Sequence, residues 1–390
     1  MRSRPHHRVR VRPAMVVVVA LLSTTLGACG FEEPPLEPVT REVLNRVEIP
    51  PISGRSAVMD AMVIDASTHT LYVADATDLS HQGVDVVDIT DLPGRYTRFI
   101  STGGTLPNGL VIVPEVHRLY TGNDDGTVSV IDTDPASKTY QTIVDTLNMN
   151  GKLAADLITY DPVDHKVYVA SPDDGFLTAI DPRTNRIVDR IENLGLVDQP
   201  MYDPADGMLY VSAVDTNLLI RIDPRTDRVL KRYPFDVACE PHGIAVNPKT
   251  NQGLIGCADK DEPVTISWDF TTEQPLRYFD LAGAGDLLEY DASVDRFFFA
   301  ASNYAPAEMA EFSGSAPITY LTSVPTSHKS HDVAYDDVHK AIFTYDGRLR
   351  EAGLWEFPDP MTRCDAQLKH CHAETGVPSP LTNGAPPRGA

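Results

Sequence analysis

Seven polar residues recur along the sequence at spacings that would bring them together in a repeating fold. They are Asp60, Asn108, Asp156, Asp198, His242, Asp286 and His331. Their side chains offer carboxylate, amide and imidazole groups, which are ligands that divalent cations prefer. Four carboxylates crowded at one place would raise their pKa values or attract a cation. A second interpretation stays open, because Asp and Asn also accept backbone N–H groups at turns and strand ends.

Within this set, His242, Asp286 and His331 form the subset best suited to a metal. Two imidazoles and one carboxylate suit Zn, Mn or Fe, with coordination positions left open. Asp332 and His328 stand close to His331 in the sequence and could orient such ligands. Each is also explained as an ordinary loop residue. The cofactor that this subset indicates is a divalent metal cation.

An internal repeat defines the set, because each member stands five residues before the same position of a repeated unit. That position is occupied by Asp65, Val113, Asp161, Asp203, Asn247, Asp291 and Asp336, at spacings of 48, 48, 42, 44, 44 and 45 residues. The repeat is clearest in "IDPRTNRIV" from Ile180 and "IDPRTDRVL" from Ile222. Each of the seven units contains four short alternating runs separated by turn residues, which is the pattern of β-strands.

This pattern predicts an all-β fold, a seven-bladed β-propeller with four-stranded antiparallel blades. The seventh unit ends after its third strand, Gly353 to Pro358, and the run Arg41 to Ile49 can supply the fourth. An N-terminal strand would then close the ring and remove its open edges. The first strand of each blade lines the centre of a propeller, so the seven polar residues would meet at one mouth. Acidic loop residues, including Asp75 and Asp215, would surround the same mouth.

The segments "LYVA" (71–74), "VYVA" (167–170) and "LYVS" (209–212) resemble the YVTN-repeat family of propellers, also called YncE-like. The resemblance covers nearly all of the mature chain, although units five to seven depart from it with "GLIG", "FFFA" and "IFTY". It implies the fold and little about activity, since the superfamily includes binding proteins, lyases, lactonases and redox enzymes.

The first 28 residues have the pattern of a bacterial lipoprotein leader. Five arginines precede an apolar run, Met15 to Leu22, that is too short to span a bilayer, and "LGAC" ends at Cys29 and resembles a lipobox. An ordinary secretory leader followed by a disulfide cysteine is the alternative. We expect residues 1–28 to be the signal peptide, 29–40 the acylated cysteine with a proline-rich tether, 41–360 the propeller, and 361–390 a largely disordered tail.

This leader predicts an extracytoplasmic protein that is lipid-anchored to a bacterial membrane. Gly30 after the lipid cysteine favours the outer membrane if the host has one. Loss of the leader would leave 28 Lys and Arg residues against 55 Asp and Glu residues. Such a charge disfavours nucleic acid and favours a cationic ligand or a basic protein partner. We expect a monomer.

The four cysteines that remain after Cys29 allow three disulfide pairings in an oxidising compartment. We favour Cys239 with Cys257, which end up at one edge of the fifth blade, and Cys364 with Cys371. The segment 364–372, "CDAQLKHCH", could instead bind zinc, whereas it lacks the usual spacing for haem attachment.

Two functions from different classes fit these observations. The first is a membrane-anchored binding or interaction module with an acidic mouth that takes a ligand or a metal. The second is a metal-dependent enzyme of the lyase or lactone hydrolase type that uses His242, Asp286 and His331. Propellers with those activities work from a comparable mouth, but their specific motifs are not evident in this sequence. A phosphate-binding glycine loop and a G-x-S-x-G nucleophile turn are also absent from it.

Overall fold

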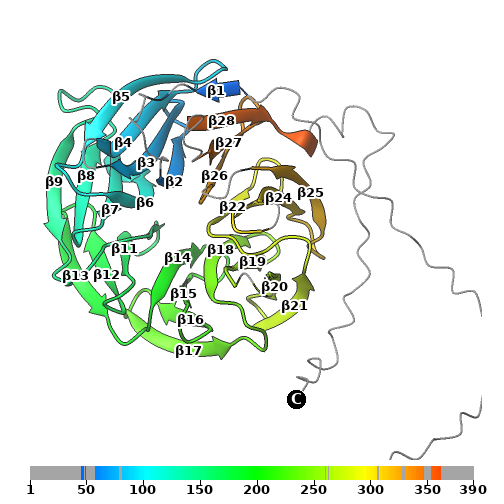
Figure 1. The fold of residues 1–390 in the computed structure, drawn as a ribbon. Coiled ribbons are helices and arrows are strands. Elements are labelled where there is room, and N and C mark those ends of the chain that lie inside the picture. The colour runs from blue at the N-terminus through cyan, green and yellow to red at the C-terminus, as the bar shows by residue number, and fades with distance from the viewer. Residues whose placement is uncertain are drawn as a thin grey trace, which may run out of the picture. The chain divides into compact units, whose positions relative to one another are not determined.

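The computed structural model describes residues 45–47, 49, 58–78, 81–259, 261, 263–304, 307–326, 330–346 and 353–361. The chain divides after Pro38 into two units, and the second, Val39–Ala390, carries every described element. In this unit, seven four-stranded antiparallel sheets follow one another around a ring (Figure 1). A single turn of 3-10 helix, η1 (Pro114–Val116), follows the strand β6. The predicted seven-bladed all-β propeller is confirmed.

The strands of the first four blades are as follows. Blade one has β2 (Met59–Asp65), β3 (Thr70–Asp78), β4 (His81–Asp88) and β5 (Arg95–Ser101). Blade two has β6 (Pro107–Val113), β7 (Arg118–Asn123), β8 (Thr127–Asp132) and β9 (Ile143–Asn148). Blade three has β10 (Ile158–Asp161), β11 (Lys166–Ser171), β12 (Phe176–Asp181) and β13 (Arg186–Ile191). Blade four has β14 (Val197–Asp203), β15 (Met208–Ala213), β16 (Leu218–Asp223) and β17 (Arg228–Pro234).

The remaining three blades complete the ring. Blade five has β18 (Pro241–Asn247), β19 (Gln252–Cys257), β20 (Thr265–Asp269) and β21 (Gln274–Phe279). Blade six has β22 (Leu288–Asp291), β23 (Arg296–Ala301), β24 (Glu308–Ser313) and β25 (Tyr320–Pro325). Blade seven has β26 (Val333–Asp336), β27 (Ala341–Asp346), β28 (Gly353–Pro358) and β1 (Asn45–Val47).

The seventh blade is assembled from both ends of the propeller. Its outer strand β1 pairs antiparallel with β28, with Arg46 opposite Trp355, and Figure 1 shows the two strands side by side. This is the predicted closure by an N-terminal strand. It gives the last blade a fourth strand and covers the backbone groups that β28 would otherwise leave open.

The hydrophobic core is divided among the junctions between blades. Among the described residues there are seven clusters of buried residues, and each lies at a junction between two neighbouring blades. The cluster that joins blades one and two also includes Leu157 of blade three and Leu287 of blade six. At the closing junction, for example, Val73 of blade one packs in the same cluster as Phe343 and Leu354 of blade seven. Each sheet therefore buries both of its faces, as packed layers require.

The repeated sequence motifs hold neighbouring blades together. Tyr168 of β11 is fully buried, and its hydroxyl donates to Asp227 and to the carbonyl of Pro224, in the turn after β16 of the next blade. Tyr120 makes the same contacts one blade earlier, with Asn185 and Pro182. The two turn residues, Asn185 and Asp227, have φ angles of 52° and 53°, a left-handed conformation that Asn and Asp tolerate.

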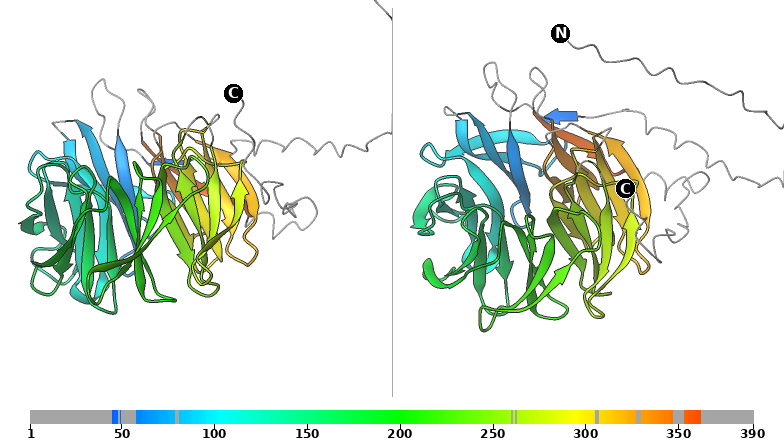
Figure 2. Two further views of the ribbon diagram at one scale, coloured as in Figure 1. Left: turned by 90° about the horizontal axis from the view of Figure 1, so that it is seen from below. Right: turned by 60° about the horizontal axis from the view of Figure 1, so that its bottom comes forward.

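The first strand of each blade lies innermost and the fourth lies outermost, as the labels of Figure 1 show. The side views in Figure 2 show the strands running between the two faces of the ring. Consecutive strands are antiparallel, so the start of each first strand and the connection between strands two and three lie at the same face. Among the described residues, no helix is long and apolar enough to cross a membrane.

Candidate functional site

The structure places all seven polar residues at or just before the start of an innermost strand. Four of them are the second residue of their strand, namely Asp60, Asn108, Asp198 and His242. The other three precede their strand by two residues, namely Asp156, Asp286 and His331. We call this set the ring residues. The repeat brings them to equivalent positions because each innermost strand ends five residues later.

Three ion pairs cross between neighbouring blades within the ring. Nδ1 of His331 lies 2.8 Å from Oδ2 of Asp286 and 4.0 Å from Oδ1 of Asp60. Nε2 of His242 lies 3.3 Å from Oδ2 of Asp198. Nδ1 of His242 is held at 2.8 Å from the carbonyl oxygen of Glu240, which leaves Nε2 as the nitrogen that faces the ring.

The side chains of Asn108 and Asp332 form hydrogen bonds with backbone groups. Nδ2 of Asn108 donates to the carbonyl of Ala155 in the next blade at 3.1 Å. The buried carboxylate of Asp332 accepts the backbone N–H groups of Met62 and Val333, at 2.6 and 2.8 Å. Asp332 therefore accepts backbone N–H groups as the capping interpretation describes, whereas Asn108 holds a carbonyl group instead. His328 lies outside the described residues.

Glycines follow two ring residues where neighbouring backbones approach closely. A Cβ atom on Gly109 would lie 2.5 Å from Cα of Leu157, and one on Gly243 would lie 2.4 Å from the carbonyl oxygen of Asp286. Both distances are far below van der Waals contact. The sequences "PNG" and "PHG" therefore let the strand starts crowd together beside the ring.

The ring carboxylates act on one another across the centre of the propeller. Burial raises the pKa of Asp60 to about 6, with Asp286 adding to the effect and His331 opposing it. Burial also raises the pKa of Asp156 and of Asp198 well above the ordinary value, and repulsion from carboxylates of other blades adds to each. Because the interacting residues belong to blades one, three, four and six, their side chains face a common centre.

One carboxylate of the ring is stabilised in its charged form. Burial would raise the pKa of Asp286, but its hydrogen bond with His331 and the imidazolium charge lower it. The same hydrogen bond raises the pKa of His331 to about 9. At neutral pH, therefore, this pair holds one positive and one negative charge.

The structure brings only two of the three predicted metal ligands, His242, Asp286 and His331, into contact with each other. His331 contacts Asp286, whereas His242 contacts Asp198. In the described part of the chain, one group of three metal-binding side chains has ligand atoms all within 4.8 Å of one another, and it is a different group: Asp75, His81 and Asp85. Metal binding by His242, Asp286 and His331 stays a prediction.

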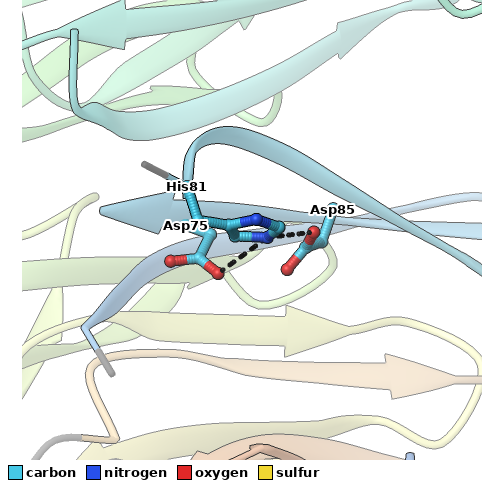
Figure 3. Close-up of side chains that lie close together, drawn as sticks. All are labelled: Asp75, His81 and Asp85. Carbon is cyan, nitrogen blue, oxygen red and sulfur yellow. Dashed lines mark hydrogen bonds and ion pairs between the residues drawn. The ribbon is translucent and has the colours of Figure 1, made fainter. Parts of the chain in front are cut away.

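The second group lies in blade one and was missed in the sequence. Asp75 belongs to β3 rather than to a loop at the mouth, and His81 and Asp85 belong to β4. Figure 3 shows Nε2 of His81 between the two carboxylates. The available signal was the alternation in "HQGVDVVD", which puts residues 81, 83 and 85 on one face of a strand.

The cysteines divide between the described and undescribed parts of the chain. Cys239 and Cys257 form a disulfide with a Cα–Cα distance of 4.5 Å, beside the start of β18 and at the end of β19. The sequence analysis favoured the same pair. Cys29, Cys364 and Cys371 lie outside the described residues.

Comparisons with known proteins support the fold. No family model matches the chain, and no curated protein matches its sequence. A chain in a structure described as the crystal structure of a mitotic checkpoint complex is similar, with a TM-score of 0.62 and 14% sequence identity, over 87% of this chain and 99% of that chain. At that identity the likeness shows the propeller fold alone. Since 1636 chains of solved structures match, the fold does not select a function.

Proposed function

We propose that this chain is a propeller interaction module whose acidic mouth, formed by the ring residues, binds a cationic ligand or a basic segment of a partner protein. The observation that carries the proposal is that carboxylates of four different blades lie at equivalent positions at the starts of the innermost strands, where they repel one another. Burial and this repulsion raise the pKa values of Asp60, Asp156 and Asp198. A positive group placed among them would relieve both effects.

The charge of the ring supports a cation rather than an anion as its ligand. His331 compensates Asp286, so three further carboxylates meet at the centre with the imidazole of His242 beside one of them. The whole sequence adds to the field, with 55 acidic against 33 basic residues. Such a field attracts cations and basic surfaces and raises their rate of association.

The proposal includes the membrane anchor and the resemblance to YVTN-repeat propellers. Its support is the leader pattern that ends at Cys29 and the repeated segments such as "LYVA" and "VYVA". An acylated Cys29 and the tether 29–40 would present the propeller outside the cytoplasm. Residues 1–40 lie outside the described residues, and so does the tail 362–390.

We favour a binding module over the metal-dependent lyase or lactone hydrolase. The enzyme needs His242, Asp286 and His331 to converge on one cation. The two histidines instead contact carboxylates of different blades, Asp198 for His242 and Asp286 for His331. A bound metal would have to draw these pairs together.

The proposal is tested by titrating the purified chain with spermidine and with a lysine-rich peptide. The double variant Asp156→Asn/Asp198→Asn should bind both at least about tenfold more weakly, because each hydrogen bond to a charged group contributes about 1.5–3 kcal/mol. The matched control Asp91→Asn/Asp189→Asn changes the same charge at exposed positions.

The pH dependence provides a second readout. Wild-type binding should be stronger at pH 8 than at pH 5, because Asp60 has a pKa of about 6 and is ionised only at the higher pH. The proposal is wrong if the ring variant and the exposed control bind both probes equally well. It is also wrong if neither probe binds at low ionic strength, where such contacts are strongest.

A further inference from the structure

We propose that Asp75, His81 and Asp85 form a second cation site, separate from the ring residues, that takes a divalent metal of the zinc class. Ligand atoms of the three side chains lie within 4.8 Å of one another. Nε2 of His81 lies 3.2 Å from Oδ1 of Asp85 and 3.6 Å from Oδ2 of Asp75. The site lies in blade one and goes beyond the proposed function of the mouth.

These separations match those of metal ligands. With Zn–N and Zn–O bonds of about 2.1 Å, two ligands of a tetrahedral site lie roughly 3.4 Å apart. The two measured separations, 3.2 and 3.6 Å, lie on either side of this value. A single N–H group of the imidazole points at one acceptor at a time, whereas a metal ion at this point would bind His81 and both carboxylates.

The register of blade one explains how the three side chains meet. In the pairing of β3 with β4, Val73 lies opposite Asp85 and Asp75 lies opposite Gly83. Residues on alternate positions share a face, so Asp75, His81 and Asp85 lie on the same side of the sheet. Gly83 places no side chain among them, and a Cβ atom there would lie 2.2 Å from the carbonyl oxygen of Ile100.

The cluster is buried and the imidazole is held in place. The side chains of Asp75 and Asp85 are 0% exposed, and that of His81 is 16% exposed. The His81 ring stacks on Phe99, with centroids 3.9 Å apart and planes 19° apart. The small opening to solvent lets a metal ion enter. The stacked ring presents its nitrogen to that ion in one fixed orientation.

A separate observation supports the binding of a cation at this point. Oδ2 of Asp85 is buried and has no hydrogen-bond partner. Buried carboxylate oxygens are normally paired or coordinate metals, because an uncompensated charge away from water is unfavourable. In Figure 3 this oxygen is turned toward the side of Asp75. Burial, the charges of Asp85 and Asp75, and a hydrogen bond with Asp85 raise the pKa of nearby Tyr96 to about 12.

One nitrogen and two carboxylate oxygens select the class of metal. Imidazole nitrogen suits zinc, whereas calcium and magnesium prefer oxygen ligands alone. Three protein ligands leave a fourth position for water. The face that carries the cluster packs on blade seven, so a metal here would tie β3 to β4 beside the junction where the ring closes.

The test uses the whole chain, stripped with a chelator and titrated with ZnCl₂ at pH 7.5 by calorimetry. We expect His81→Ala and the nearly isosteric Asp85→Asn to weaken zinc binding by more than about 100-fold, since even outer partners of metal ligands contribute about 10- to 100-fold. The variants His165→Ala, at a half-exposed ion pair, and His331→Ala, in the ring, should keep this site.

A measurement on the wild type removes dependence on the folding of variants. Zinc should shift the ¹⁵N resonance of His81 Nε2 at one molar equivalent. Absence of that shift overturns the proposal, and so does wild-type affinity in both His81→Ala and Asp85→Asn. If zinc binding is lost in His331→Ala alone, the metal belongs to the ring and the proposal is wrong.

Discussion

Replacing Asp60 by Asn should make the protein more stable at neutral pH. In the folded chain, burial and Asp286 raise the pKa of Asp60 from 3.8 to about 6, against the opposing effect of His331. The side chain is only 24% exposed, so little solvent screens these effects. At about 1.36 kcal/mol for each pH unit, ionised Asp60 destabilises the folded state by about 3 kcal/mol. Asn removes the charge and keeps the shape.

The pH dependence of this difference has a defined direction. Below pH 3.8 Asp60 is protonated in both the folded and the unfolded state, so wild type and variant should be alike. Between pH 4 and pH 6 the unfolded chain loses this proton first, and the wild type loses stability relative to the variant. Above pH 6 the full difference is present, and a domain of about 320 residues should melt about 4–5 °C higher as Asp60→Asn.

The assay is thermal unfolding followed by circular dichroism at pH 4 and pH 7.5. Asp91→Asn is the control, because Asp91 is exposed in a turn and should change the melting temperature by less than about 1 °C. The reasoning is refuted if Asp60→Asn lowers the melting temperature at pH 7.5, or if its effect is the same at both pH values. Saturating spermidine should narrow the gap by stabilising the wild type.

Two further predictions concern contacts away from the ring. Arg296→Met should lower the free energy of unfolding by about 3–5 kcal/mol in urea, because Arg296 compensates two fully buried carboxylates of blades six and seven. The control Arg225→Met breaks an exposed ion pair and should leave the urea midpoint nearly unchanged. Equal urea midpoints for the two variants would contradict this prediction. Replacing Cys239 and Cys257 together by Ser should lower that free energy by about 3 kcal/mol, since the disulfide closes a loop with a sequence separation of 18; unchanged unfolding would show that the crosslink contributes nothing.

The propeller could be predicted because its repeats encode contacts between blades. The Tyr of "VYVA" and the Asp of "IDPRTD" are 59 residues apart, yet Tyr168 donates to Asp227. A buried hydroxyl needs such a partner, so both ends of the contact recur with the period of the blades. The motifs that suggested a family are therefore explained by the fold, and they carry no chemistry of a ligand site.

The position of the ring residues was predictable, but their pairing was not. A constant offset of five residues from the end of each innermost strand puts the side chains at equivalent places. Which partner each takes depends on side-chain rotamers and on the backbone before the strand. His242 is anchored by the carbonyl of Glu240 and faces Asp198, whereas His331 faces Asp286.

The cluster of Asp75, His81 and Asp85 in blade one could not be predicted from the sequence, for a different reason. Alternation alone places His81 and Asp85 on one face of β4. Bringing Asp75 to them requires the register between β3 and β4, which shifts between Asp75 and Asp78 at an irregularity. Such an irregularity changes which residues lie opposite each other. No residue type in this hairpin indicates where the register shifts.

The stability of the fold does not explain the carboxylates of the ring. Among the described residues the core lies in seven clusters at the junctions between blades. Near the ring, backbone groups of neighbouring blades are held by Asn108, Gln199 and Asp332, none of which is a carboxylate of the ring. The carboxylates of Asp60, Asp156 and Asp198 instead meet with raised pKa values, which lowers stability at neutral pH. Groups that oppose folding at a common point are typical of sites that act on something else. A cation delivered to that point would convert the repulsion among these carboxylates into binding energy.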